Sequence, residues 1–277
     1  MDLIDIDKRE LHDIRKIIAI TKSEGSISNK FIYKIGKLNC RLIVVKTSKI
    51  VQSDSNILID IFNLIVKMTS GYIIFLSSNA VDVFFESATS LNVFNKIVDD
   101  LNSKFTVIAI GPSTQRALIK NNIVGCKVPP DHSSLGIIEL LSQLKNDKYE
   151  PKIIVPRSKK ADKFLKEQLL ELGFEIDEFY IYNVIPAEVN SLWLEFFNLL
   201  RRKKIDSLIF TSPSNVNYFI NILQNHSSDL LPLVSKIKLI LSIGPLTSKV
   251  LFEYNIPFIE SKNHSLEGIY ETLYMKL

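Results

Sequence analysis

The sequence predicts an α/β protein of two similar, doubly wound parallel-sheet domains. The first observation is a repeat: "VIAIGPSTQRALIKNNI", from Val107, returns as "LILSIGPLTSKVLFEYNI", from Leu239, with Gly-Pro-x-Thr kept in both copies. The second is the pattern of each copy, in which an apolar run, a Gly-Pro cluster and an amphipathic stretch are typical of a strand, a turn and a helix. Continuous apolar strands that alternate with helices indicate parallel strands covered on both faces.

The repeat extends to both sides of this phrase. "IIFLSSNAVDVFF", from Ile73, precedes the first copy, and "LIFTSPSNVNYFI", from Leu208, precedes the second. After the two copies come "DHSSLGIIELL", from Asp131, and "KNHSLEGIYETL", from Lys262. Each outer match again places a hydroxyl-bearing turn before an amphipathic stretch, which predicts the start of a helix. Three matches in the same order indicate two domains of one fold.

A fourth element predicts that one domain is discontinuous. After the first "HSSLG" the chain continues with "KIIVPRSKKADKFLKEQLLELGFEIDEFYIY", a strand and then a helix with Leu165, Leu169 and Leu172 on one face and Gly173 at its end. The second half lacks this unit, whose counterpart "KIIAITKSEGSISNKFIYKIGKLNCRLIVV" stands near the N-terminus, with Asn39 in place of Gly173. We therefore expect domain 1 at 1–46 plus 188–277, domain 2 at 53–181, hinge strands at 47–52 and 182–187, and a cleft between the domains.

Composition limits the function classes. At 277 residues and 46% hydrophobic residues the chain is globular, and Lys236 and Lys238 interrupt the apolar run "LLPLVSKIKLILSI", so no membrane span is expected. The acidic N-terminus lacks a secretory pattern, which predicts a cytoplasmic protein. Cys40, Cys126 and the four histidines show no ligand spacing, so neither zinc nor a disulfide is expected. The net charge of +4 is spread over scattered lysines, which favours an anionic small molecule over nucleic acid.

The strand-to-helix turns are the candidate binding elements. In a parallel sheet they collect at the carboxyl ends of the strands, where unpaired N–H groups and positive helix ends favour anions. These hydroxyl-rich turns suit a ligand with several carboxylates or phosphates, and Arg157, which directly follows a strand, is a further candidate. The candidates are Ser77, Ser78, Asn79, Gly111, Ser113, Thr114, Ser133 and Ser134 in one domain, and Ser212, Ser214, Asn215, Gly244 and Thr247 in the other.

The same turns also have a purely structural interpretation. Ser, Thr and Asn are ordinary N-cap residues, each worth about 1 kcal/mol, and Thr114 and Thr247 are expected to act as caps. Gly111 and Gly244 are expected to permit a tight turn. No Walker loop or Gly-x-Gly-x-x-Gly fingerprint is present in the sequence, which argues against a nucleotide ligand.

The sequence resembles the uroporphyrinogen-III synthase family. The motifs that match occur in the same order and extend over nearly the whole chain. The matching segments are "IFLSSNAV", "AIGPSTQRAL", "PDHSSLGIIELL", "VPRSKKADKFLKEQLLELGFEIDEFYIYNV", "IFTSPSNV" and "SIGPLTSKVL". The resemblance implies two domains of about five parallel strands each, joined by a two-stranded ladder. It also implies a lyase of tetrapyrrole biosynthesis that closes hydroxymethylbilane, a linear octacarboxylate, to uroporphyrinogen III with inversion of ring D. The family uses no metal or organic cofactor for this reaction.

The resemblance assigns roles to individual residues. The usual general acid of the family is a Tyr at the return crossing, matched here by Tyr182, although Tyr180 lies on the same face at strand period two. Family positions also match Thr114, Thr247, Ser77, Ser212, Ser133 and Ser134. The family often has Arg-Pro after the first strand, where this chain has Thr21-Lys22, so Lys22 replaces an arginine contact. We expect a monomer that can receive the bilane from hydroxymethylbilane synthase through a transient contact.

Two alternatives remain at this point. The chain can be a non-catalytic ligand sensor of the same bilobal fold, which the missing arginine after the first strand favours and the retained Tyr182, Thr114 and Thr247 disfavour. It can also be a sugar- or phosphate-ligand enzyme with two Rossmann-like lobes. That class requires an acidic ribose-binding residue after a glycine-rich turn, and the sequence has none.

Overall fold

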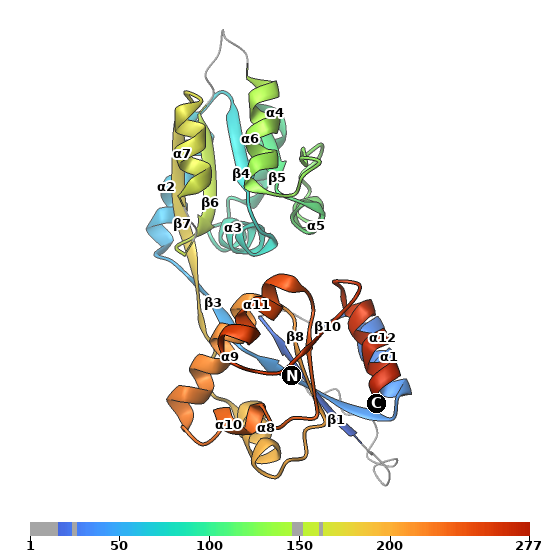
Figure 1. The fold of residues 1–277 in the computed structure, drawn as a ribbon. Coiled ribbons are helices and arrows are strands. Elements are labelled where there is room, and N and C mark those ends of the chain that lie inside the picture. Colours follow the sequence, from blue (N-terminus) through green and yellow to red (C-terminus); the bar gives the residue numbers. More distant parts are fainter. Residues whose placement is uncertain (1–15, 24–26, 146–151, 161–162) are drawn as a thin grey trace. The chain divides into compact units, whose positions relative to one another are not determined.

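The fold is taken from a computed structural model that describes residues 16–23, 27–145, 152–160 and 163–277. Its elements follow one another as alternating strands and helices along most of the chain (Figure 1). In chain order they are β1 (Lys16–Lys22), α1 (Asn29–Lys37), β2 (Cys40–Lys46), β3 (Ser48–Gln52), α2 (Ser55–Lys67), β4 (Gly71–Phe75), α3 (Ser78–Ser90), α4 (Phe94–Lys104), β5 (Phe105–Ala109), α5 (Pro112–Lys120), α6 (Ser134–Leu144), β6 (Ile153–Ser158), α7 (Phe164–Glu171), β7 (Ile176–Pro186), α8 (Ser191–Arg201), β8 (Ser207–Phe210), α9 (Pro213–His226), α10 (Leu231–Val234), β9 (Leu239–Ser242), α11 (Pro245–Glu253), β10 (Ile259–Glu260) and α12 (Leu266–Lys276).

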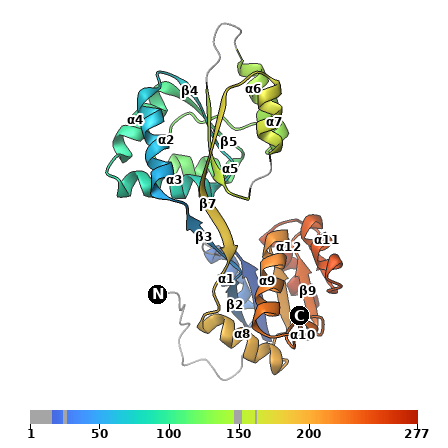
Figure 2. The same ribbon diagram turned by 90° about the vertical axis from the view of Figure 1, so that its left-hand side faces the viewer.

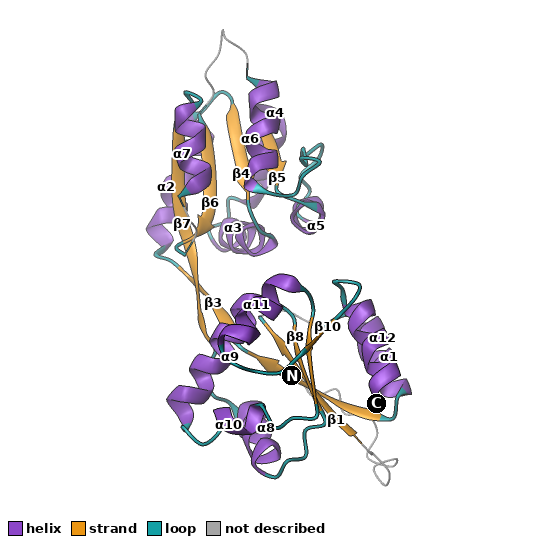
Figure 3. Cartoon of the chain, viewed as in Figure 1, coloured by secondary structure: helices purple, strands orange, loops and turns teal. Residues whose placement is uncertain are grey.

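The strands form two five-stranded sheets, drawn in orange in Figure 3. One has the order β10-β9-β8-β1-β2 and the other β3-β7-β6-β4-β5. Pairing is parallel between β1 and β2, β1 and β8, β8 and β9, and β9 and β10 in the first sheet, and between β4 and β5, β4 and β6, and β6 and β7 in the second. The predicted fold class, two similar parallel-sheet α/β domains, is therefore confirmed.

The chain divides into two compact units. Unit 1 comprises the described residues up to Lys49 together with Ile185–Leu277, and unit 2 comprises Ile50–Val184. The N-terminal strand β1 pairs with β8, so that Ile18 lies opposite Ser207 across 189 positions of sequence. The chain changes unit within β3 and again within β7, which Figure 2 shows as neighbouring strands.

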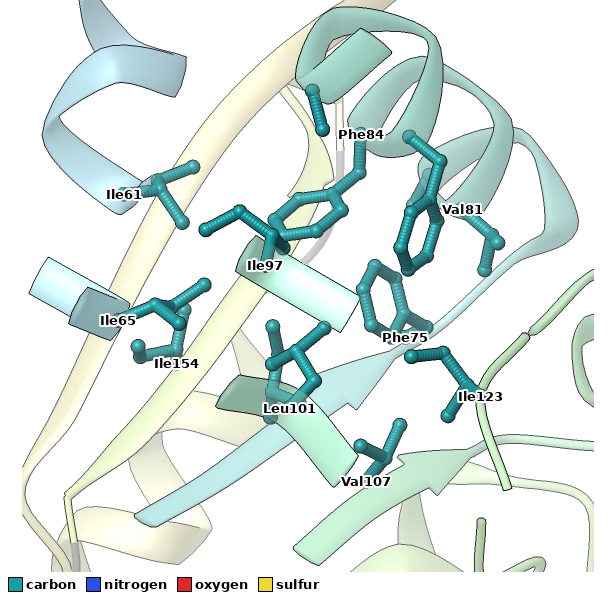
Figure 4. Packing of buried hydrophobic residues seen from close by; sticks show 14 of the residues in the cluster. Ile61, Ile65, Phe75, Val81, Phe84, Ile97, Leu101, Val107, Ile123 and Ile154 are labelled. Carbon is teal, nitrogen blue, oxygen red and sulfur yellow. The ribbon is translucent and has the colours of Figure 1, made fainter. Parts of the chain in front are cut away.

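In unit 2 the side chains of one strand alternate between two buried layers. On one face of the sheet Ile73 and Phe75 pack against α2, α3 and α4, as Figure 4 shows for Phe75, Phe84 and Leu101. On the other face Tyr72 and Ile74 pack against α6 and α7. This alternation of a wholly apolar strand explains why the sequence pattern is a continuous run rather than an alternating one.

Unit 1 repeats this arrangement with different residues. One face of its sheet packs against α8, α9, α10 and α11, where Trp193, Phe196 and Phe219 form a buried aromatic cluster. The other face packs against α1 and α12. Each unit is therefore a three-layer sandwich whose strand-to-helix turns lie at the carboxyl ends of the parallel strands.

The predicted equivalence of Asn39 and Gly173 is confirmed. Both residues follow a helix and adopt left-handed backbone angles, with φ of 54° for Asn39 and 79° for Gly173. Asn and Gly are the residues that most readily take this conformation at the end of a helix.

Among the helices of the described residues, none has both the length and the apolar character that crossing a bilayer requires.

Candidate functional site

Four serines cap helices at the strand-to-helix turns, two in each unit. The Ser77 hydroxyl accepts a hydrogen bond from Ala80 N at 3.1 Å, and the Ser212 hydroxyl accepts one from Asn215 N at 3.2 Å. In the later turns, Ser133 and Ser265 accept bonds from the backbone N of Gly136 and Gly268, each at 3.2 Å. The capping interpretation of Ser77, Ser133 and Ser212 is confirmed, and each such cap stabilises its helix by about 1 kcal/mol.

The interpretation of Gly111 and Gly244 as residues that permit a tight turn is wrong. Their φ angles of −170° and 176° are extended and open to any residue. Instead, each glycine is approached by a histidine of the next turn: a Cβ on Gly111 would lie 3.3 Å from His132 Cβ, and one on Gly244 would lie 3.2 Å from His264 Cγ. The absent side chain therefore makes room for an imidazole at the same place in both units.

Thr114 and Thr247 lie in the first turns of α5 and α11. The expectation that they cap these helices is wrong, because Gly111 and Gly244 occupy the N-cap positions and neither helix has a side-chain cap. Both threonines are almost wholly buried, with 3% and 2% exposure. In the described part of the chain neither hydroxyl has a hydrogen-bond partner.

In unit 1, Asn215 joins the ends of three strands. Its Oδ1 accepts hydrogen bonds from Thr47 at 2.7 Å and from Ser23 at 2.9 Å, and its Nδ2 donates to Thr211 Oγ1 at 2.8 Å. This buried network occupies the Asn215 side chain with protein partners. Lys22, at the end of β1, is half-buried, and burial lowers the pKa of its ammonium group.

The other predicted turn residues keep at least part of their surface exposed. Ser214 is exposed, with its hydroxyl 3.1 Å from Ser212 Oγ. In unit 2 the remaining candidates lie in the first turns of α3, α5 and α6, and they are Ser78, Asn79, Ser113 and Ser134.

Tyr182 lies beside the start of α3. Its hydroxyl is 2.9 Å from Ser77 Oγ, the same oxygen that caps this helix, while its ring packs in the core and is 5% exposed. Burial raises the pKa of Tyr182, and the hydrogen bond with Ser77 and the positive charge of Arg157 act in the opposite direction. The hydroxyl therefore lies beside the N-terminal, positive end of α3.

Tyr180 and Tyr182 do not share one environment, contrary to the expectation from strand period two. The pairing of β6 with β7 shifts register between Arg157 and Ser158, so that Arg157 lies opposite Tyr180 and Ser158 opposite Tyr182. The Tyr180 hydroxyl donates to Glu178 Oε2 at 3.3 Å, and its side chain is 37% exposed. Of the two hydroxyls, the one on Tyr182 contacts a turn predicted to bind substrate.

Contrary to the expectation that it directly follows a strand, Arg157 lies within β6, one residue before the strand ends, and its partner comes from the protein. The guanidinium forms an ion pair with Glu178, and the two side chains are 5% and 3% exposed. Lys166 Nζ lies 4.0 Å from the same carboxylate. Sequence reasoning missed Glu178, because no pattern marks an acidic residue that faces inward from a strand.

A second cluster that sequence reasoning missed surrounds the Gly244 turn in unit 1. Ser248 Oγ donates to Glu260 Oε2 at 2.5 Å and contacts the buried Ser242 hydroxyl at 2.9 Å. The other Glu260 oxygen lies 3.5 Å from His264 Nε2. The copy of this turn in unit 2 lacks these polar side chains. The corresponding residues there are Ala109 for Ser242, Gln115 for Ser248 and Val128 for Glu260. Only a position-by-position comparison of the two copies would have revealed the cluster.

Within the described ranges no group of three or more His, Cys, Asp or Glu side chains is placed to hold a metal ion. The predicted turns contain hydroxyl groups and helix starts, and Lys22 lies at the end of β1.

Replacing Ser77 by Ala is expected to lower the free energy of unfolding by about 1 kcal/mol through the lost cap. It also removes the hydrogen-bond partner of Tyr182. Asp54→Ala is the matched control, since Asp54 caps α2 in the same way, by accepting a hydrogen bond from Asn56 N at 2.9 Å. Chemical denaturation should show similar losses, while only Ser77→Ala should reduce turnover; equal turnover of the two variants would leave Ser77 with a capping role alone.

Comparison with known proteins gives consistent matches. A family model described as uroporphyrinogen-III synthase HemD matches residues 32–271. A curated Methanothermobacter thermautotrophicus protein, "Putative uroporphyrinogen-III synthase", is 25% identical over 201 residues, which are 73% of this chain and 76% of the relative. A mutant uroporphyrinogen III synthase from Thermus thermophilus has a TM-score of 0.59 at 16% identity, covering 94% of this chain and 98% of its own. Uroporphyrinogen-III synthetase from Helicobacter pylori has a TM-score of 0.58 at 18% identity, covering 95% and 100%.

Proposed function

Since the chain belongs to the uroporphyrinogen-III synthase family, we propose that it closes hydroxymethylbilane to uroporphyrinogen III with loss of water. In this proposal the chain is a lyase of tetrapyrrole biosynthesis, it works without a cofactor, and Tyr182 is its general acid. The observation that carries the proposal is the contact of the Tyr182 hydroxyl with Ser77 at the start of α3, at 2.9 Å.

The reaction requires little more than one proton and a fixed geometry. The terminal carbon–oxygen bond of the bilane breaks with its electron pair on oxygen, while the pyrrole nitrogen supplies electrons to the carbon and a protonated azafulvene, which keeps its N–H, forms. Tyr182 gives its O–H proton to the departing oxygen, which leaves as water. A general acid of this kind contributes ~10²–10⁴-fold to a rate. Because burial raises the pKa of Tyr182, the hydroxyl keeps its proton until the substrate takes it.

Positioning of ring D decides which isomer forms. The substituted carbon of ring D attacks the azafulvene, and the resulting spiro intermediate fragments and recloses with ring D inverted. The carbon that forms the final bond loses a proton as its pyrrole becomes aromatic again, and that proton returns to the Tyr182 phenolate. Only water is lost overall, so the protein acts by orienting groups and stabilising charge.

The turn residues supply contacts for the carboxylates of the bilane. In this proposal the hydroxyls of Thr114 and Thr247 and the Lys22 ammonium are the principal ones. The supporting observation is that the two threonine hydroxyls lie at helix starts, where anions are stabilised, and make no hydrogen bond in the described part of the chain. Asn215 has a supporting role instead, since its amide is occupied by Thr47, Ser23 and Thr211.

The direct test is to incubate the full chain with freshly prepared hydroxymethylbilane and to separate the type I and type III products. Without enzyme the bilane closes to the uninverted type I isomer, so an excess of type III is the expected result. Binding of the bilane without any type III product would overturn the proposed catalysis and support the ligand-sensor alternative.

Thr114→Val and Thr247→Val are each expected to raise KM for the bilane by about tenfold, the loss of one hydrogen bond to a charged group. Since neither hydroxyl caps a helix and Val keeps the shape of the side chain, the free energy of unfolding should change by less than the ~1 kcal/mol that a lost cap costs. Thr89→Val is the control, because Thr89 Oγ1 bonds within α3 to Phe85 O at 2.9 Å. Steady-state kinetics with unchanged KM for both variants would remove these residues from the site.

A further inference from the structure

Two charged side chains are buried together inside unit 2. Arg157 and Glu178 are 5% and 3% exposed and form an ion pair through Arg157 Nη1 and Glu178 Oε1. The second Glu178 oxygen accepts a hydrogen bond from Tyr180, and Arg157 Nε is buried without a hydrogen-bond partner among the described residues. A protein carboxylate therefore already pairs with the guanidinium, in the place that a substrate carboxylate would take.

An ion pair buried in this way is expected to contribute little to the stability of the fold. Withdrawing two charges from water costs several kcal/mol per ion, and replacing a buried pair by apolar residues of similar volume is often neutral or stabilising. The unpartnered Nε adds to the cost. A pair with so little expected benefit to folding points to a function of the positive charge itself.

The pair lies at the place where the backbone sets the position of Tyr182. The register of β6 and β7 shifts directly after Arg157, and Lys159 N then donates to the carbonyl oxygen of Tyr182 at 2.9 Å. The positive charge of Arg157 lowers the pKa of Tyr182, opposing the effect of burial. In the pairing of β6 with β7, Arg157 lies opposite Tyr180, two residues before Tyr182 along the strand.

We propose that Arg157, held in place by Glu178, serves the reaction through Tyr182 and does not bind a substrate carboxylate. This inference rests on the proposed general acid. When the Tyr182 O–H bond breaks and its proton moves to the departing oxygen, the phenolate left behind is stabilised by the guanidinium charge. The phenolate is neutralised when it takes up the proton released at ring closure. Arg157 and Glu178 are therefore positioning residues of this site.

A double-mutant cycle separates this role from direct binding. Arg157→Met is expected to lower kcat about tenfold with little change in KM, and to have no further effect in the Tyr182→Phe background, where no phenolate forms. A raised KM in both backgrounds would show that Arg157 binds substrate. An equal loss of kcat in both backgrounds would likewise overturn the proposal, because the effect would not pass through Tyr182.

The paired variant Arg157→Met/Glu178→Leu controls for folding. It replaces the ion pair by apolar side chains, so its unfolding transition is expected to return to that of the parent, while kcat stays reduced. Recovery of kcat together with stability would assign the pair a purely structural role.

A titration without substrate makes the inference independent of turnover. The ultraviolet absorbance of tyrosinate, taken as the difference between a protein that keeps Tyr182 and the same protein carrying Tyr182→Phe, reports the ionisation of this one hydroxyl. Arg157→Met is expected to move it to higher pH, and Arg157→Lys to restore part of the shift; an unmoved titration overturns the inference. If Tyr182→Phe alone leaves turnover intact, the proposed general acid fails, whatever the titration shows.

Discussion

Tyr182→Phe is expected to lower kcat for closure to the type III isomer by about 100-fold or more, within the range that a general acid contributes. The ring is buried in the core of unit 2, and Phe keeps its bulk. Among the described residues, the hydrogen-bond partner of the Tyr182 hydroxyl is Ser77. In the variant, Ser77 Oγ still accepts its hydrogen bond from Ala80 N. Stability should therefore change by only about 1 kcal/mol, and the loss of rate should isolate the proton donor.

The control is Tyr180→Phe. The Tyr180 hydroxyl bonds to Glu178 and its side chain is 37% exposed, so its loss should leave the rate within a small factor of the parent. Single-turnover kinetics with product separation measures both variants. Impairment of Tyr180→Phe with an intact Tyr182→Phe would reassign the acid, and two unimpaired variants would leave the azafulvene chemistry to the substrate and the helix starts.

The topology could be predicted from the sequence because it depends on patterns that repeat. The strand-helix-strand unit that begins at Lys16 resembles the unit that contains Gly173, and this resemblance predicts that it completes the sheet of the C-terminal half. The structure agrees, because β1 pairs with β8. The equivalence of Asn39 and Gly173 follows from their shared place after a helix, where a left-handed residue is needed. Serine caps likewise follow a local rule, because a cap and the N–H it binds are three residues apart.

The details that sequence reasoning missed depend on contacts between distant residues. Gly111 and Gly244 are closely approached by an imidazole about 20 residues further along the chain, which no local turn rule describes. The separation of Tyr180 from Tyr182 results from a register shift against β6, and strand period two assumes that no such shift occurs. The burial of Arg157 depends on Glu178, whose inward orientation is a property of the folded sheet.

Gly136→Ala and Gly268→Ala are expected to be the most destabilising of the substitutions considered for these turns. These glycines share one place in the repeat, four positions after His132 and His264. A Cβ on Gly136 would lie 1.9 Å from Asp131 O, and one on Gly268 would lie 2.2 Å from Asn263 O. Real Cβ contacts are never this short, so the preceding turn must move or the helix start must distort. Overpacking against backbone atoms is expected to cost about 3 kcal/mol or more.

Gly36→Ala is the matched control, because Gly36 lies in α1 of unit 1 and a Cβ there would meet nothing within 4 Å. Since Ala is the better helix former, this variant should gain up to about 1 kcal/mol. In thermal and chemical unfolding, the midpoints of Gly268→Ala and Gly136→Ala should therefore lie well below that of the parent. The midpoint of Gly36→Ala should lie at or above it. An unchanged midpoint for either repeat glycine would mean that its turn relaxes at no cost, and that the His-Ser-x-x-Gly pattern is kept for a reason other than close approach of the backbone.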